Sequence, residues 1–98
     1  MSRIFNDQKT VAAAGTAELL KTAESEVNVI TIKAESTNTG YIYVGDADVD
    51  STNGFILSAG EEVTIFIDDD DTDIYIDSSV NGDGVSFIGW LNENRSRR

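Results

Sequence analysis

The chain has 98 residues, of which 18 are acidic and 7 basic, so its formal net charge is −11, and 40% of its residues are hydrophobic. An acidic surface repels nucleic acid and anionic lipid, and no apolar run reaches the roughly 20 residues that span a bilayer, so neither nucleic acid nor membrane is an expected partner. Histidine and cysteine are both absent, which removes the commonest general base, the commonest zinc ligands and all thiol chemistry, and we expect a single domain that is not an enzyme.

The first 25 residues have the weakest pattern. Residues 1–10 show no clear period and are predicted to form an N-terminal arm. Alanine and leucine between Val11 and Ser25 favour a helix by propensity, but Gly15 interrupts them and no helical period follows. Thr16–Leu20 is therefore predicted to be a strand.

From Val27 onward, short runs rich in β-branched and aromatic residues predict one strand after another. Val27 and Val29 are out of phase with the rest of their run, which predicts a bulge or burial on both faces. The expected strands are Val27–Ala34, Tyr41–Val44, Phe55–Leu57, Val63–Ile67, a run around Ile74 and Ile76, and Val85–Leu91.

Turn-forming residues separate these runs, and Asn81-Gly82 can supply the two positive φ angles of a type I′ hairpin. Strand starts about every 8–12 residues predict an all-β fold: an antiparallel β-sandwich, jelly-roll or immunoglobulin-like, of about seven or eight strands. The sandwich is expected to span residues 11–91. Residues 92–98 form a basic tail, which is either a frayed end or an anchor to an acidic neighbour.

Two acidic segments partly match a calcium-binding loop. Asp46, Asp48 and Asp50 alternate as the first ligands of such a loop do. The match then fails, because Ser51 stands where glycine is needed and Leu57 where a bidentate glutamate belongs.

The second partial match begins at Asp77 and runs through Asn81-Gly82 and Asp83, but its twelfth position is Ile88. An Asn-Gly turn explains this segment without an ion. No cofactor is expected, and solvated turns are the simpler interpretation of both segments. The candidate ligands for Ca²⁺ or another cation are Asp46, Asp48, Asp50, Asp77 and Asp83.

The densest charge is the run Asp68–Asp71, followed by Asp73. Carboxylates this close repel one another unless salt or a cation screens them. The run is interpreted as a solvated loop, with a weak cation site or a contact for a basic partner as alternatives. Together with the net charge it raises the hypothesis of adaptation to high salt. A paired-carboxylate hydrolase is disfavoured, because a sandwich of this size has little room for a cleft.

Aromatic residues give the best indication of an interface. Tyr41, Tyr43, Phe66 and Tyr75 alternate with the apolar residues that are expected to face the core. The second face of a one-sided sheet is normally polar. Aromatic groups there predict a face that another subunit covers, and ordinary surface tyrosines are the alternative.

The most distinctive segment is Tyr-Ile-Tyr-Val-Gly-Asp at residues 41–46, followed by Asn-Gly at 53–54 and Gly-Glu at 60–61. Further segments in the same order lie at 15–20, 29–34, 74–77 and 82–89. In order and spacing, this set resembles a family of small virion-associated β-sandwich proteins of tailed bacteriophages and archaeal tailed viruses. The resemblance covers residues 15–89 and includes no catalytic residue.

The resemblance implies a structural role in a virion that assembles in the host cytoplasm. The implied function is a capsid decoration, cement or head-turret protein that binds the major capsid protein, or another virion protein, as a homo-trimer or homo-pentamer. The alternative is a tail or fibre module that recognises a host surface ligand, with calcium as a candidate requirement. The acidity of this chain departs from the family's usual pattern and would fit a salt-loving host.

Overall fold

The computed structural model describes residues 2–21, 27–66 and 73–92. These residues form eight strands, and no helix occurs among them, so the predicted all-β class is confirmed. The strands are β1 (Ser2–Thr10), β2 (Glu18–Lys21), β3 (Val27–Ala34), β4 (Ile42–Gly45), β5 (Phe55–Leu57), β6 (Glu62–Phe66), β7 (Ile74–Ser78) and β8 (Gly84–Asn92).

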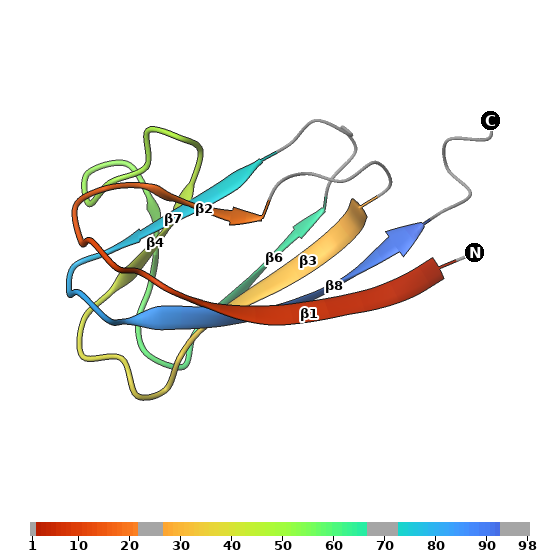
Figure 1. Cartoon of the computed structure of the whole chain (residues 1–98), viewed down its shortest axis with the longest axis horizontal. Helices are drawn as coiled ribbons and strands as arrows, with labels where there is room; N and C mark the ends of the chain where they lie inside the picture. The colour runs from red at the N-terminus through yellow and green to blue at the C-terminus, as the bar shows by residue number, and fades with distance from the viewer. Residues whose placement is uncertain (1, 22–26, 67–72, 93–98) are drawn as a thin grey trace.

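The strands form two antiparallel sheets of four. Sheet I has the order β1-β8-β3-β6, and sheet II has the order β2-β7-β4-β5. Apart from the β4–β5 pair, each described strand is followed by a strand of the other sheet. This alternation is the jelly-roll arrangement, one of the two topologies expected from the sequence. Figure 1 shows the two sheets as separate layers, with β1, β8, β3 and β6 side by side.

The strands expected from residue 27 onward are confirmed, with small shifts at their ends. Ile67, the expected end of one of them, lies outside the described residues. The register of β3 against β8 shifts between Val27 and Val29, at the place where the phase change predicted a bulge or burial on both faces. The predicted strand Thr16–Leu20 is β2, which begins later, at Glu18.

The expected N-terminal arm is a strand, and this prediction was wrong. Ser2–Thr10 form β1, which pairs with β8 along its whole length, from Ser2 opposite Asn92 to Thr10 opposite Gly84. Polar Asn6 and Gln8 lie on the exposed face of β1, so this strand lacks the apolar alternation of a half-buried one.

The Asn81-Gly82 turn is not a hairpin, because the strands on its two sides belong to different sheets. Gly82 does have a positive φ of 92°, which glycine adopts without steric cost. The side chain of Asn81 accepts a hydrogen bond from the Ala14 amide (2.7 Å), so it supports a neighbouring connection.

The hydrophobic core lies between the inward faces of the two sheets. Full burial of each aliphatic side chain contributes roughly 1.5–3 kcal/mol, and together these contributions hold the layers against each other. The ring of Phe5, from β1, packs edge-on against Phe87 of β8 at 6.5 Å between centroids. The buried core residues are Val11, Leu20, Ile30, Ile32, Ala34, Ile42, Val44, Leu57, Ile74, Ile76, Val85 and Phe87.

Candidate functional site

Strand register brings four apolar side chains into one row on the outer face of sheet I. Trp90 of β8 lies opposite Ile4 of β1 and, on its other side, opposite Val29 of β3. Val29 in turn lies opposite Phe66 of β6. Residues opposite one another in antiparallel strands share a face, so the four form a continuous line across the sheet, which we call the apolar row.

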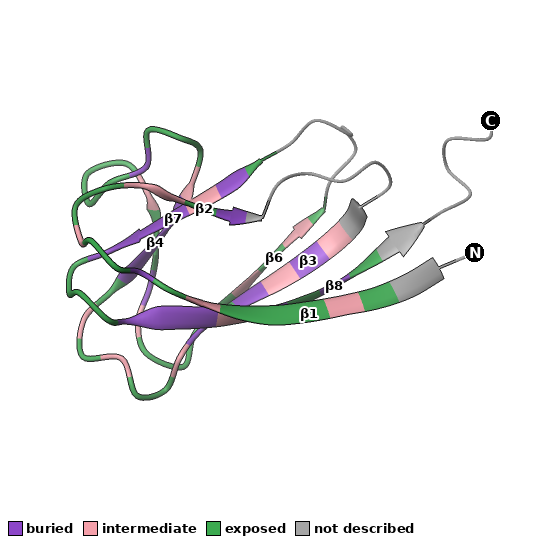
Figure 2. Ribbon diagram, viewed as in Figure 1, coloured by how far each residue is buried: buried purple, intermediate pink, exposed green. Residues whose placement is uncertain are grey.

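The apolar row is open to solvent. The exposed fraction is 62% for Ile4, 44% for Trp90 and 80% for Phe66, and Val29 is half-buried. Ile88, the next outward residue of β8, is 51% exposed. The burial colouring in Figure 2 shows exposed residues along β1, at the edge of the sheet, and alternating burial along β3 in its interior.

Beyond the apolar row, and apart from Ile88, the same face becomes polar and close to neutral. Thr31 and Thr64 face each other with their hydroxyl oxygens 2.8 Å apart. Lys33 lies opposite Glu62, so one positive and one negative charge neighbour each other. The next row is Asn6, Ile88, Thr31 and Thr64, and the one after it is Gln8, Ser86, Lys33 and Glu62.

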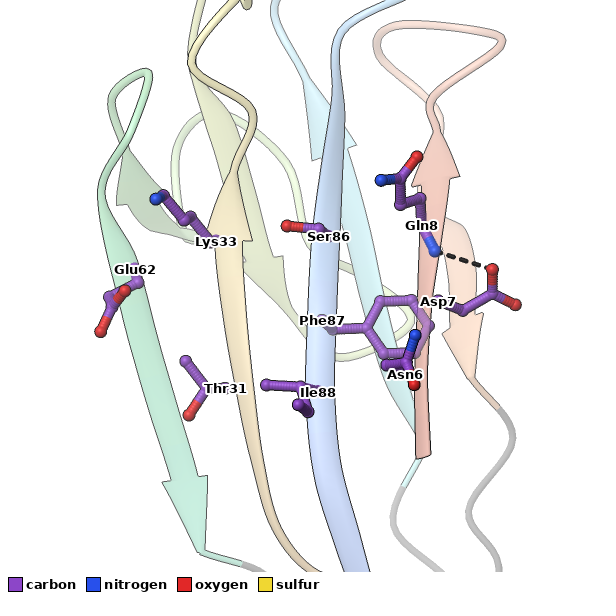
Figure 3. Close-up of a pocket in the computed structure, with 9 residues that line it drawn as sticks. All are labelled: Asn6, Asp7, Gln8, Thr31, Lys33, Glu62, Ser86, Phe87 and Ile88. Carbon is purple, nitrogen blue, oxygen red and sulfur yellow. Dashed lines mark hydrogen bonds between the residues drawn. The ribbon is translucent and has the colours of Figure 1, made fainter. Parts of the chain in front are cut away.

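This polar part of the face is a shallow hollow of about 540 Å³. Figure 3 shows its side chains standing on the neighbouring strands β6, β3, β8 and β1, with Asp7 at the β1 edge. The only hydrogen bond drawn there joins the Asp7 carboxylate to the backbone amide of Gln8 (2.8 Å). The face therefore offers a broad contact surface bounded by the apolar row.

The outer face of sheet II is covered by the chain itself around Tyr43, whereas Ile56 of β5 stays 52% exposed on the same face. Tyr43 of β4 points away from the core, yet only 7% of it is exposed. Val49, in the connection after β4, is 3% exposed and lies against Gly45 and Gly54. A side chain at Gly54 would meet the Cβ of Tyr43 at 2.6 Å, so that glycine lets the connection lie directly on the tyrosine.

The four aromatic residues predicted as an interface do not share a surface. Tyr41 precedes β4 and is 50% exposed, while Tyr43 is buried under its own chain. Tyr75 of β7 is half-buried on sheet II, and Phe66 lies on sheet I. The prediction of one face is corrected, because strands that look alike in sequence belong to opposite layers. The interface role of each residue stays a prediction.

The candidate cation ligands are also separated. Among the residues that the structure describes, no three acidic side chains gather as a metal-binding group. Asp46 and Asp50 each accept hydrogen bonds from backbone amides two residues later, of Asp48 (3.0 Å) and Thr52 (2.8 Å). The Thr52 hydroxyl also donates to Asp50 (2.6 Å), and this bond lowers the pKa of the Asp50 carboxyl.

The other two candidate ligands are buried and serve backbone amides. Asp77 is 1% exposed and accepts from the amides of Gly15 (2.8 Å) and Ser78 (2.7 Å). Asp83 is 6% exposed and accepts from Thr39 (3.2 Å) and Gly40 (2.8 Å). Both carboxylates tie a connection to the sandwich, which the sequence interpretation missed. Cation binding by any of the five aspartates stays a prediction. The run at 68–71 lies outside the described residues.

Glu18 is a further anchoring residue that the sequence interpretation missed. One of its carboxylate oxygens accepts hydrogen bonds from the amides of Ala12 (3.0 Å) and Ala13 (2.9 Å). The other lies 3.2 Å from the Lys9 ammonium. The Ala13 hydrogen bond in particular lowers the pKa of Glu18. A glutamate just after an alanine-rich turn gives no local signal for this role, which depends on the fold.

The apolar row was missed for a related reason. The outward phase of Ile88 and Trp90 is visible in the sequence, but their neighbours come from strands far away in the chain. Ile4 lay in the segment that was expected to be an arm.

No family model matches the chain, and no curated protein sequence matches it significantly. Among solved structures, its fold is similar to a protein of Bacillus endospore appendages, described as a novel family of disulfide-linked pili. The TM-score is 0.62 at 12% sequence identity, over 93% of this chain and 84% of the other. Similarity at this level of identity supports the sandwich fold. The 98 residues contain no cysteine, so they cannot form the disulfide links of those pili.

In the part of the chain that the structure describes, no helix is long and apolar enough to cross a membrane.

Proposed function

We propose that this chain is a non-enzymatic structural subunit of a tailed-virus particle, and specifically a capsid decoration or head-turret protein that forms homo-oligomers. The observation that carries the proposal is the apolar row on the uncovered face of sheet I. Its action would be to add contact area between subunits of a shell.

The size of the exposed apolar surface supports this role. Ile4, Ile88, Trp90 and Phe66 together leave on the order of 500 Å² of apolar side chain in water, which is the size of patches that mark binding surfaces. While the apolar row is in solvent, its side chains contribute little to the free energy of folding, because that contribution comes from their burial. A partner that covers the row recovers this free energy.

The placement of the polar residues agrees with the same role. Asp77, Asp83 and Glu18 hold connections through backbone amides, so these carboxylates act in the architecture of the sandwich. The sequence resemblance over residues 15–89 supports the assignment to a virion. The fold similarity to a pilus protein supports assembly from repeated subunits, and it favours a fibre or tail module as the second candidate.

Quantitative mass spectrometry of particles purified from cells that carry this gene tests the proposal. A decoration protein is expected in many copies, in a fixed ratio to the major shell protein. A ratio of a few copies per particle would favour the tail or fibre module. Absence from purified particles, with the chain present in the cell extract, would contradict both candidates.

A further inference from the structure

We propose that the outer face of sheet I binds the same face of a second copy of this chain, forming a two-fold dimer in which the two apolar rows cover each other. The inference rests on the proposed structural function and names the partner of its exposed face. It predicts a dimer where the sequence resemblance implies a trimer or pentamer.

Coverage of the two sheets differs in a way that singles out this face. On sheet II, the connections around Gly15 and Val49 cover the middle of the outer surface and bury Tyr43, and Ile56 on the β5 edge is left 52% exposed. On sheet I, the described connections leave Ile4 and Phe66 mostly in solvent. The larger uncovered apolar surface is therefore on the outer side of sheet I.

Charge favours a second copy as the occupant. Two chains of net charge −11 repel each other, and the repulsion is least where the facing surfaces are neutral. Among the twelve residues of the three rows on this face, Lys33 and Glu62 are the charged ones, and Asp7 stands at the rim. This face can approach its own copy without placing like charges against each other.

Strand register fixes how two copies fit. A two-fold axis in the interface, parallel to the strands, places β1 against the partner's β6 and β8 against the partner's β3. Ile4 then meets the partner's Phe66, and Trp90 meets the partner's Val29. Further along, Glu62 meets the partner's Gln8, and Lys33 meets the partner's Ser86. Each of these pairings occurs twice, as a two-fold contact requires. The two sheets then stack face to face with their strands aligned, as the sheets of a sandwich do.

The available area is sufficient for a weak but specific dimer. The four strands β1, β8, β3 and β6 contain 9, 9, 8 and 5 residues. At about 3.3 Å per residue and about 4.8 Å between strands, the face measures on the order of 500 Å² for each copy. Two such faces bury about 1,000 Å² in total, the size at which a contact begins to qualify as a specific interface. We therefore expect a dimer that is strengthened when salt screens the net charge.

Trp90 is the single tryptophan of the chain, and it lies in the apolar row. The first test is sedimentation velocity of the full chain over a concentration series in molar NaCl, with acrylamide quenching of Trp90 fluorescence on the same samples. Dimerisation is expected to reduce the quenching constant by about half as the tryptophan is buried. A monomer at all concentrations, or a dimer whose Trp90 stays as accessible as in the monomer, would overturn the proposal.

A matched pair of variants separates this face from the opposite one. Ile4→Ser removes an isoleucine that is 62% exposed on sheet I, and Ile56→Ser removes one that is 52% exposed on β5 of sheet II. Ile4→Ser is expected to raise the dimer Kd about tenfold, and Ile56→Ser less than about twofold. Equal effects of the two changes would contradict the assignment to sheet I.

Mixing two charge variants tests the register. Association of the mixture also shows that neither variant is monomeric because it has failed to fold. Ile4→Lys and Phe66→Asp are each expected to be monomeric. Their mixture is expected to form a heterodimer, because the new lysine and aspartate face each other while the second contact stays native. Failure of two folded variants to associate when mixed would overturn the register.

The particle measurement keeps this inference separate from the proposed function. A chain that is abundant in particles but monomeric in solution, with Trp90 accessible, would assign the face to a different shell protein. That result would refute the dimer and leave the structural function standing.

Discussion

Individual carboxylates in this protein act as connectors between loops and strands. Asp83 is 6% exposed, and its two oxygens receive the amides of Thr39 and Gly40. Amides in such a turn need an acceptor once they leave water, and a carboxylate offers two strong ones. Burial of an aspartate is therefore compatible with stability here, because each oxygen has a partner.

We expect Asp83→Ala to lower the free energy of unfolding by about 2–3 kcal/mol, since two amides lose a charged acceptor. Urea denaturation followed by circular dichroism measures the change. Asp48→Ala, on the exposed connection after β4, is the control and is expected to change stability by less than about 0.5 kcal/mol. Equal losses for the two variants would refute the anchoring role of Asp83.

Glu18 makes stability depend on pH in a predictable direction. Its pKa is lowered from the ordinary 4.5, with the Ala13 amide as the largest favourable contact. A carboxyl whose pKa is lower in the folded state stabilises the fold above its unfolded pKa. This contribution is lost as the pH falls through the folded pKa.

Glu18→Gln is accordingly expected to destabilise the protein by about 1 kcal/mol at pH 7, with the difference shrinking as the pH falls below about 4. Melting temperatures of the two proteins between pH 7 and pH 3 provide the measurement. A difference that stays constant over this range would show that the charge of Glu18 contributes nothing.

At the level of elements, the packing of β1 across β8 depends on one glycine of β8. Gly89 lies opposite Phe5 on the inner face of sheet I. A Cβ at this position would meet the carbonyl oxygen of Val29 and, at 2.8 Å, the tip of the Phe5 ring. The absence of a side chain lets the ring of Phe5 lie across β8 and reach Phe87.

Gly89→Ala is expected to cost about 2–3 kcal/mol, because the new methyl group meets a strand backbone that cannot move aside. Thermal unfolding measures this loss. Ser86→Ala, on the outer face of the same strand, is the comparison and should change stability by less than about 0.5 kcal/mol. A Gly89→Ala protein as stable as the parent would mean that Phe5 can be displaced at little cost.

Much of this architecture was predictable from local pattern, because alternation and turn residues are local properties. The strands after Val27 and the bulge beside Val29 follow from the phase of apolar residues. The identity of each strand's neighbours could not be obtained that way. β1 pairs with β8 from the far end of the chain, so the row joining Ile4 to Trp90 has no signal in either segment alone.

At the scale of the whole molecule, the net negative charge opposes folding through electrostatic repulsion. A charge of −11 on 98 residues produces repulsion that favours expanded states. Salt shortens the range of this repulsion from about 10 Å at 0.1 M to about 3 Å at 1 M. Stability should therefore rise with ionic strength.

We expect the melting temperature to rise by about 5–10 °C between about 0.05 M and about 1 M NaCl. The double variant Asp46→Asn, Asp48→Asn should show a smaller rise, because it carries less negative charge. If the chain is adapted to high salt, it should unfold in dilute buffer. A domain that is equally stable at both salt concentrations would remove that interpretation.

The position of β8 also has a consequence for synthesis. This strand lies between β1 and β3 in sheet I, although it is the last of the strands that the structure describes. Until residue 92 has left the ribosome, β1 has no neighbour in its sheet and the inner edge of β3 is unpaired. The domain must therefore wait for its final strand before it can close, as expected for folds dominated by distant contacts. Its early strands remain open to wrong pairing during translation, and chaperone demand should fall as soon as β8 emerges.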